Sequence, residues 1–224
     1  MRTGLRPETR CAHLDNLYQG APHSPFLMPI SAFENYRGFA VDKLFNWREE
    51  AGLTSKLLAC LLFAVLMALA AQVRLYLPFT PVPFTGQVLV VLLVSFVLGR
   101  FGTLSVGMYL GLGASFGWFS GQIGLAALSG ITAGYLLGFV IAAAMIGEMT
   151  HRARNWNLSK IVLAMSVGAA IILVSGSIWL SVLLHLDLAQ ALLLGALPFL
   201  AVDAIKVLAA ASTAYMITPH QIRS

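Results

Sequence analysis

An acidic and a basic residue stand three positions apart inside an otherwise apolar stretch near the end of the chain. Asp203 and Lys206 are separated by Ala204 and Ile205. Residues three apart share one face of a helix, so the two side chains can pair. An ionisable side chain near the middle of a bilayer costs about 2.5–3.5 kcal/mol to insert. The pair is either a neutralising ion pair that lets the helix insert or, as we favour, a polar anchor that faces a cavity.

A proline lies about one helical turn before this pair. Pro198 cannot donate a backbone hydrogen bond, so it interrupts a helix and frees a carbonyl. In a membrane, such breaks persist where the backbone is buried in protein or lines a cavity. The proline therefore favours the interpretation of Asp203 and Lys206 as a binding site.

A proline-rich segment follows the first apolar stretch. Residues 78–83 contain three prolines and no charge, which excludes helix and holds the backbone extended. Phe79, Val82 and Phe84 make the segment unusually apolar for a loop in water. We expect it to pack over the helices as a lid, and the alternative is a rigid connector.

Further polar and aromatic residues are predicted at the end of the helices where the proline-rich segment lies. Arg74 lies near the end of the first apolar stretch, where it either reaches the membrane interface or attracts an anionic solute. Residues 113–124 form a glycine-rich loop with Trp118 and Phe119. A helix is predicted to begin near Thr132, with its free N–H groups and positive dipole end directed toward this region.

Two other patterns carry less weight. Gly113–Gly117 fits the G-x-S-x-G pattern of serine hydrolases, with Ser115 as nucleophile and His185 as the candidate base, but it lacks the strand–turn–helix context. The glycine spacings 107/111, 130/134 and 134/138 indicate close packing of membrane helices. The sequence contains no P-loop motif for ATP, and its two cysteines offer no metal cluster.

The overall composition indicates in which class of protein, and in which environment, these residues are held. The 224 residues are 58% hydrophobic and only 10% charged, whereas a soluble domain is about 25% charged. This balance excludes a water-soluble enzyme, a disordered chain and a nucleic-acid binder. Residues 1–55 carry no net charge, so the formal charge of +5 belongs entirely to the apolar remainder.

The apolar part divides into six segments, which predict an all-α integral membrane protein with six transmembrane helices. A spanning helix needs about 20 residues. The second and third segments are shorter and glycine-rich, so tilted or partly re-entrant helices are the alternative for these two. The six segments are Lys56–Leu77, Phe84–Gly99, Gly102–Phe119, Thr132–Met149, Ile161–Leu184 and Leu188–Met216.

Positive charges alternate with the predicted spans. Arg100 follows the second span, Arg152 and Lys160 follow the fourth, and residues 78–83 and 120–131 are uncharged. The positive-inside rule then places both termini in the cytoplasm. Residues 1–55 are predicted to be a poorly ordered cytoplasmic extension, the alternative being a short amphipathic helix near Asp42–Glu50 on the membrane surface, and residues 217–224 a short tail.

Three motifs follow one another along the apolar part of the chain. Residues 81–87 read PVPFTGQ, residues 130–139 read GITAGYLLGF, and residues 195–206 follow the pattern G-x-x-P-F…D-x-x-K. Taken in this order, they resemble the PVPxTxQ, GPTGGYLLGF and G-x-x-P-F…D-x-x-K motifs of the BioY family, the biotin-binding S-components of energy-coupling-factor (ECF) transporters, with Ile131 and Ala133 in place of proline and glycine. The resemblance covers about Lys56–Met216.

The resemblance implies a six-helix bundle of the ECF S-component type that binds biotin from outside and has no catalytic residue, cofactor or metal of its own. It implies a transmembrane coupling protein (T-component) and cytoplasmic ABC-type ATPases as partners, and Ala64 and Ala68 match the family's coupling-protein contact. A different vitamin, or an ion-coupled carrier that uses Asp203, is the alternative. The residues expected to bind substrate are Asp203, Lys206, Tyr135, Thr132, Gly134, Gln87, Phe79, Phe84, Trp118, Phe119, Gln122 and Arg74.

Overall fold

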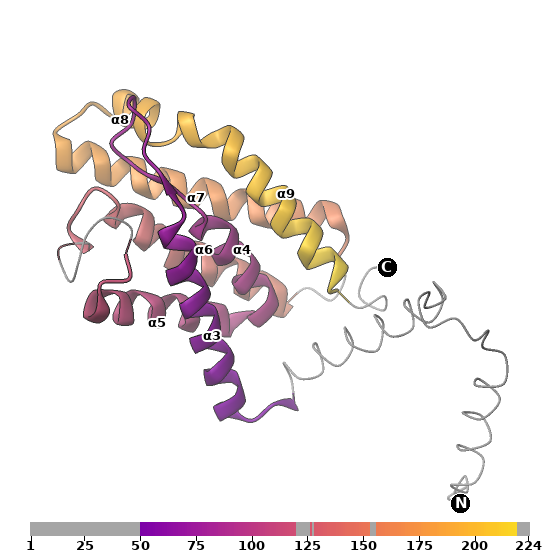
Figure 1. Ribbon diagram of the computed structural model, residues 1–224. Helices are drawn as coiled ribbons and strands as arrows, with labels where there is room; N and C mark the ends of the chain where they lie inside the picture. Colours follow the sequence, from indigo (N-terminus) through magenta and orange to yellow (C-terminus); the bar gives the residue numbers. More distant parts are fainter. Residues whose placement is uncertain (1–49, 120–125, 127, 153–155, 219–224) are drawn as a thin grey trace, which may run out of the picture. The chain divides into compact units, whose positions relative to one another are not determined.

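Helices make up most of the structure, as the apolar segments predict. The computed structural model describes residues 50–119, 126, 128–152 and 156–218, all within one compact unit, Ala40–Ser224. In chain order the elements are α3 (Leu53–Gln72), β1 (Arg74–Leu75), β2 (Phe84–Thr85), α4 (Gln87–Leu98), α5 (Arg100–Phe116), α6 (Ala133–Arg152), α7 (Leu158–Leu184), α8 (Leu188–Gly195), η2 (Leu197–Phe199) and α9 (Leu200–Met216) (Figure 1).

The prediction of six membrane segments is confirmed at the level of the fold. By length and composition, α3, α6, α7 and the stretch Leu188–Met216 are each able to cross a membrane. The second and third segments become the shorter helices α4 and α5, with 12 and 17 residues. The fold is therefore an all-α membrane fold with six helical segments, of which the last is interrupted.

The first predicted span is too long at its carboxyl end. Helix α3 ends at Gln72, because the chain then turns into a two-residue strand that pairs antiparallel with β2. Arg74 lies opposite Thr85, and Leu75 lies opposite Phe84. Arg74 is thus in a strand and not in the last helical turn, and the second helix begins at Gln87. The prolines of residues 78–83 occupy the connection between the two strands.

The last segment breaks where Pro198 predicts a break. Helix α8 ends at Gly195, and a 3-10 turn, Leu197–Phe199, leads into α9. Within this turn the Phe199 N–H donates to the Ala196 carbonyl at 3.0 Å, so it no longer serves the Gly195 carbonyl four residues back. Asp203 and Lys206 follow on the first turns of α9.

Helices α6 and α7 share the most extensive contact of any helix pair in the described residues, and glycines on α6 allow this close packing. A Cβ built at Gly134 would lie 2.2 Å from Trp179 Cβ, and one built at Gly138 would lie 2.9 Å from Ile172 Cα. Only glycine permits backbones to approach this closely. Helix α7 also packs against α8 and α9, and α4 packs against α6 and α9. These helices enclose the core that carries the site.

Several predictions concern residues that the structure does not describe. The surface helix near Asp42–Glu50 falls almost entirely outside the described residues, as do Gln122 and most of the tail 217–224. The boundaries proposed for the amino-terminal extension and the tail remain predictions.

Candidate functional site

A cavity lies between α4, α5, α6, α7 and the interrupted last segment. The space open to the centres of water molecules is about 40 Å³, which is room for about three waters. With the gaps between side chains and the mouth included, the void is about 550 Å³. Its lining residues are Val82, Pro83, Thr85, Gln87, Val88, Tyr109, Phe119, Thr132, Tyr135, Leu136, Phe139, Ile172, Leu173, Phe199, Asp203 and Lys206.

An ion pair occupies one side of this cavity. Lys206 Nζ donates to Asp203 Oδ1 at 2.8 Å, and the side chains are 13% and 4% exposed. The i, i+3 spacing on α9 brings the two groups together. Burying both charges costs solvation energy unless further polar groups complete their hydrogen bonds. One carboxylate oxygen and two ammonium hydrogens are left over by this bond, so the pair can both accept from and donate to a ligand.

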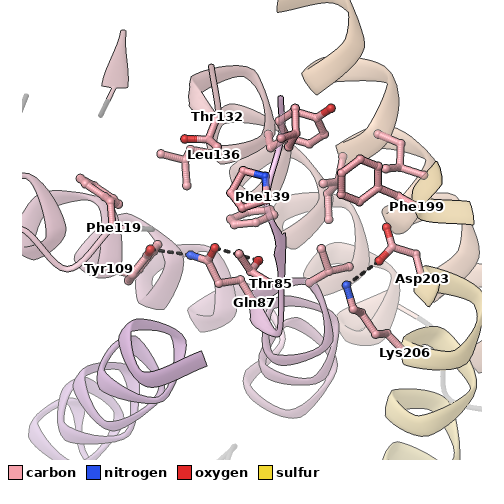
Figure 2. Close-up of a pocket in the computed structure, with 16 residues that line it drawn as sticks. Thr85, Gln87, Tyr109, Phe119, Thr132, Leu136, Phe139, Phe199, Asp203 and Lys206 are labelled. Carbon is pink, nitrogen blue, oxygen red and sulfur yellow. Dashed lines mark hydrogen bonds and ion pairs between the residues drawn. The ribbon is translucent and has the colours of Figure 1, made fainter. Parts of the chain in front are cut away.

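A chain of neutral polar groups lies on another side of the same cavity (Figure 2). Thr85 Oγ1 donates to Gln87 Oε1 at 3.0 Å, and Gln87 Nε2 donates to the Tyr109 hydroxyl. All three side chains line the cavity, and Tyr109 is fully buried on α5. Because the Tyr109 oxygen accepts from Gln87, its own proton remains available for a ligand acceptor.

Apolar and aromatic side chains form the rest of the lining. Tyr135 and Phe199 lie with their ring centroids 6.3 Å apart, and Tyr109 meets Phe119 edge to face at 5.6 Å. Phe139, Leu136 and Leu173 add apolar surface. The site therefore combines an apolar interior with a charged pair and a separate hydroxyl donor, which suits a small ligand that is apolar in the middle and polar at its ends.

Half of the residues expected to bind substrate line this cavity. They are Asp203, Lys206, Tyr135, Thr132, Gln87 and Phe119. They come from four separate stretches of sequence, which the fold brings together at one place. Their contact with a ligand stays a prediction.

Three more of the expected residues lie close to the lining without being part of it. Phe84 stacks on Phe199 with centroids 4.2 Å apart, so it backs a lining residue. Gly134 is buried against α7, where it serves helix packing. Trp118 is partly buried and stacks on Phe116.

The other expected residues are placed elsewhere. Phe79 is 58% exposed. Arg74 Nη2 donates to Gln72 Oε1 at 3.4 Å in an exposed contact, and Arg74 is not among the residues that line the cavity. Gln122 lies outside the described residues.

The predicted lid is tethered to the broken helix. Thr80 Oγ1 donates to the Leu194 carbonyl at 2.7 Å, which is the carbonyl that Pro198 leaves without its helical partner. Val82 and Pro83 of the same segment line the cavity. The segment therefore packs onto the helices, as expected from its apolar composition, and supplies part of the wall.

Sequence reasoning missed several lining residues. Tyr109 carried a signal, because it is the one tyrosine of the third apolar segment and its hydroxyl needs a partner there. Thr85, Leu136, Phe139 and Phe199 belong to motifs that were recognised, but they were not singled out. Ile172 and Leu173 look like any other apolar residue of a membrane helix, and only the packing shows that they face the cavity.

The two alanines expected to contact a coupling protein lie on the inward side of α3. Ala64 and Ala68 belong to the buried core, whereas Leu62 and Leu69 are each 61% exposed. Their contact with a partner stays a prediction, and the large apolar side chains that α3 exposes are leucines and valines.

The hydrolase-like pattern has no suitable local structure. Gly113–Gly117 continues helix α5 to its end and is not a turn after a strand. Ser115 Oγ donates to the Gly111 carbonyl of its own helix at 3.0 Å. His185 caps α7 in a left-handed conformation. This arrangement does not support a nucleophilic serine.

Comparison with known proteins agrees with this architecture. The model of the BioY family matches residues 41–222. The chain is 37% identical over 157 residues to the biotin transporter BioY of Thermotoga maritima, covering 67% of this chain and 88% of that protein. It is 34% identical over 158 residues to the biotin transporter BioY2 of Lactococcus lactis subsp. cremoris, covering 69% and 86%.

A solved structure shares the fold. The crystal structure of the S-component for biotin from an ECF-type ABC transporter superposes with a TM-score of 0.66, covering 72% of this chain and 89% of that chain. The sequence identity is 22%, so this likeness concerns the arrangement of the helices.

Proposed function

The chain belongs to the BioY family, and from this premise we propose that it binds biotin and takes part in its uptake across the cell membrane. It does so as the substrate-specific component of an ECF-type transporter and not as an enzyme. The named relatives are biotin transporters. The observation that carries the proposal within this chain is the buried Asp203–Lys206 pair on the wall of a largely apolar cavity.

The chemistry of biotin matches the two polar parts of the lining. The ureido ring has two N–H donors and one strong acceptor, which suit the Asp203 carboxylate and the Lys206 ammonium. The thioether ring and the aliphatic chain suit the aromatic walls around Tyr135 and Phe199. The carboxylate of biotin then lies toward the Tyr109 hydroxyl or the start of α6 at Thr132, where helix N–H groups favour an anion.

The size of the cavity sets a condition on binding. Room for about three waters is less than a bicyclic vitamin needs, so side chains must move apart when the ligand enters. Phe119 and Tyr109, which meet edge to face at the wall, are among the side chains that border this space. Binding therefore rearranges side chains of the cavity wall.

Import requires a source of energy that other subunits supply. The partners of this component are a transmembrane coupling protein and cytoplasmic ABC-type ATPases, which use ATP. The proposed orientation places both termini in the cytoplasm. It is supported by Glu148, which binds both Arg100 and Arg152, because this contact brings two predicted cytoplasmic turns to the same end of the bundle.

Equilibrium binding of radiolabelled biotin to the purified protein tests the proposal. Asp203→Asn and Lys206→Ala should each weaken binding by about 2–5 kcal/mol, because each leaves a buried charge without its partner. Asp187→Asn is the matched control, since Asp187 is an exposed helix cap and asparagine also caps helices.

The outcomes separate the alternatives. Unchanged affinity in both variants would place biotin elsewhere. Tight binding of another vitamin in preference to biotin would assign the chain a different substrate, and uptake that follows a proton gradient and stops with Asp203→Asn would favour an ion-coupled carrier. Binding of biotin methyl ester as tight as that of biotin would exclude a strong contact with the carboxylate.

A further inference from the structure

The ring of Tyr135 forms part of the cavity wall and packs closely against two glycines. Tyr135 is 7% exposed and lines the cavity from α6. Its hydroxyl donates to the Gly195 carbonyl at 2.7 Å. That carbonyl is free to accept because the turn at Pro198 has taken the Phe199 N–H away to Ala196. The helix break therefore supplies the acceptor that holds the hydroxyl end of the Tyr135 ring in place.

The back of the ring rests directly on α7. A Cβ built at Gly176 would lie 2.2–2.3 Å from three ring atoms, Cε1, Cδ1 and Cζ. Real Cβ atoms essentially never come so close to another atom, so any side chain at position 176 must displace the ring. A Cβ at Gly195 would lie 2.7 Å from the Tyr135 hydroxyl oxygen. Glycines from two different helices thus form the seat of one side chain.

Helix α6 is packed tightly on α7 one residue earlier, because a Cβ at Gly134 would meet the Ser175 carbonyl at 2.7 Å. The Tyr135 side chain can turn more easily than two packed helices can separate, so the ring is the part that moves first. The Tyr135 ring borders the cavity, where Phe199 is its neighbour, with ring centroids 6.3 Å apart. A larger residue at 176 therefore pushes Tyr135 into the space that a ligand would occupy.

We propose that Gly176, which does not itself line the cavity, determines how large a ligand the cavity accepts by seating Tyr135. Gly176 is a positioning residue, and it acts through the tyrosine ring. The proposal rests on the proposed function, since it concerns the same cavity and uses biotin as the probe.

The test compares two ligands of different size. Biotin and desthiobiotin carry the same ureido ring and carboxylate, but desthiobiotin lacks the sulfur and the second ring. We expect Gly176→Ala to weaken biotin binding by about tenfold or more, the usual size of an overpacking effect, and to weaken desthiobiotin binding less. The measured quantity is the ratio of the two dissociation constants, which a general loss of stability would not change.

Gly168→Ala is the matched control on the same helix. Gly168 is buried on α7, but a Cβ there meets the Ile146 and Leu92 side chains, which do not line the cavity. This variant should leave the ratio of the two dissociation constants at its wild-type value. A changed ratio in Gly168→Ala would mean that any added bulk on α7 alters the cavity, and the specific role of Gly176 would be wrong.

Double substitutions test whether the effect passes through the ring. With Tyr135→Leu already present, adding Gly176→Ala should cost little further affinity, because the atoms it collides with are gone. Gly195→Ala is the second variant, and should Gly176→Ala fail to fold it carries the test. Its closest contact is with the Tyr135 hydroxyl at 2.7 Å, and Ser177 Oγ and Leu180 Cδ2 lie at 3.1 and 3.3 Å. Tyr135→Phe should therefore relieve most of the Gly195→Ala defect while leaving the Gly176→Ala defect in place.

Different binding results would overturn the role of Gly176 and the proposed function. If the wild-type protein binds no biotin, the proposed function is wrong and this inference falls with it. If the wild type binds biotin and Gly176→Ala binds both ligands as the wild type does, only this inference is overturned. Equal losses from Gly176→Ala with and without Tyr135→Leu would likewise overturn it.

Discussion

Two helices of this bundle carry glycines at the same four-residue spacing, and their surroundings are opposite. On α6, Gly134 and Gly138 are buried against α7, where an added Cβ would collide with backbone atoms. On α5, Gly107 and Gly111 are exposed, and a Cβ at either would meet no atom of the described residues within 4 Å. The spacing alone predicted close packing for both.

The difference shows what a glycine spacing can and cannot indicate. It marks a helix face on which another backbone is able to approach closely, but it does not identify the neighbour. On α6 the neighbour is α7, and the resulting pair holds Tyr135 at the cavity wall. On α5 the face turns away from the rest of the described chain. Only the α6 glycines therefore contribute to the geometry of the site.

The largest effect is expected at the closest contact. Gly134→Ala places a Cβ 2.2 Å from Trp179 Cβ and 2.7 Å from the Ser175 carbonyl. Neither atom is the end of a flexible side chain, so the helices must separate. We expect a loss of about 3 kcal/mol in the free energy of unfolding, measured as a lower midpoint of thermal unfolding in detergent. A midpoint equal to that of the wild type would show that α6 and α7 are not packed as described.

Gly138→Ala should have an intermediate effect. Its Cβ would lie 2.9 Å from Ile172 Cα and 3.2 Å from Ser175 Cβ, so a small shift of α7 relieves the overlap. The expected loss is about 1–2 kcal/mol in the free energy of unfolding, by the same measurement. Because Ile172 lines the cavity, biotin affinity should fall as well. A loss larger than that of Gly134→Ala would reverse the order of closeness along this face.

The sequence predicts features that depend on local composition, and it does not predict features that depend on which neighbour packs against a residue. Hydropathy and charge found the six helical segments, because a membrane helix is specified by local composition. The end of the first helix was wrong, since the strand pair of Arg74 with Thr85 depends on a contact across the proline-rich connection. Asp203, which carries a charge, and Tyr135, which belongs to a motif, line the cavity, whereas the charged Arg74 does not.

Tyr109 and Leu173 show why the rest of the site was out of reach. Both lie in helices that are apolar on every side, so the sequence does not indicate which face turns inward. Their position in the lining follows from the way α5 and α7 pack on α4 and α6. The seat of Tyr135 is similar, because it needs Gly176 and Gly195 from two other helices.

An ion pair between Arg100 and Glu148 joins α5 to α6. The exposed glycines of α5 do not take part in this contact. Glu148 accepts from Arg100 Nε at 2.7 Å and from Arg152 Nε at 2.6 Å. Glu148→Gln removes the carboxylate and leaves two neighbouring cations, so unfolding should occur at a slightly lower temperature. The groups are partly exposed, and exposed pairs contribute little. The shift should therefore be smaller than that of either α6 glycine variant.

Salt concentration provides the control for this third prediction. Ions screen exposed charges over about 10 Å at 0.1 M and about 3 Å at 1 M. The difference in unfolding midpoint between Glu148→Gln and the wild type should thus shrink as salt is raised. A difference that persists at 1 M salt would mean that Glu148 acts through packing and not through its charge.

The smallest effect is expected on the open face of α5. Gly107→Ala adds a methyl group where the described chain has no atom within reach, so nothing needs to move. Alanine also favours helix over glycine by up to about 1 kcal/mol. The unfolding midpoint of the purified protein should therefore equal or exceed that of the wild type, and biotin affinity should not change. A clear loss of stability would contradict the contrast between the two faces, because it would require a second backbone against Gly107. Size-exclusion chromatography of the same sample would then show whether that backbone belongs to a second copy of this chain.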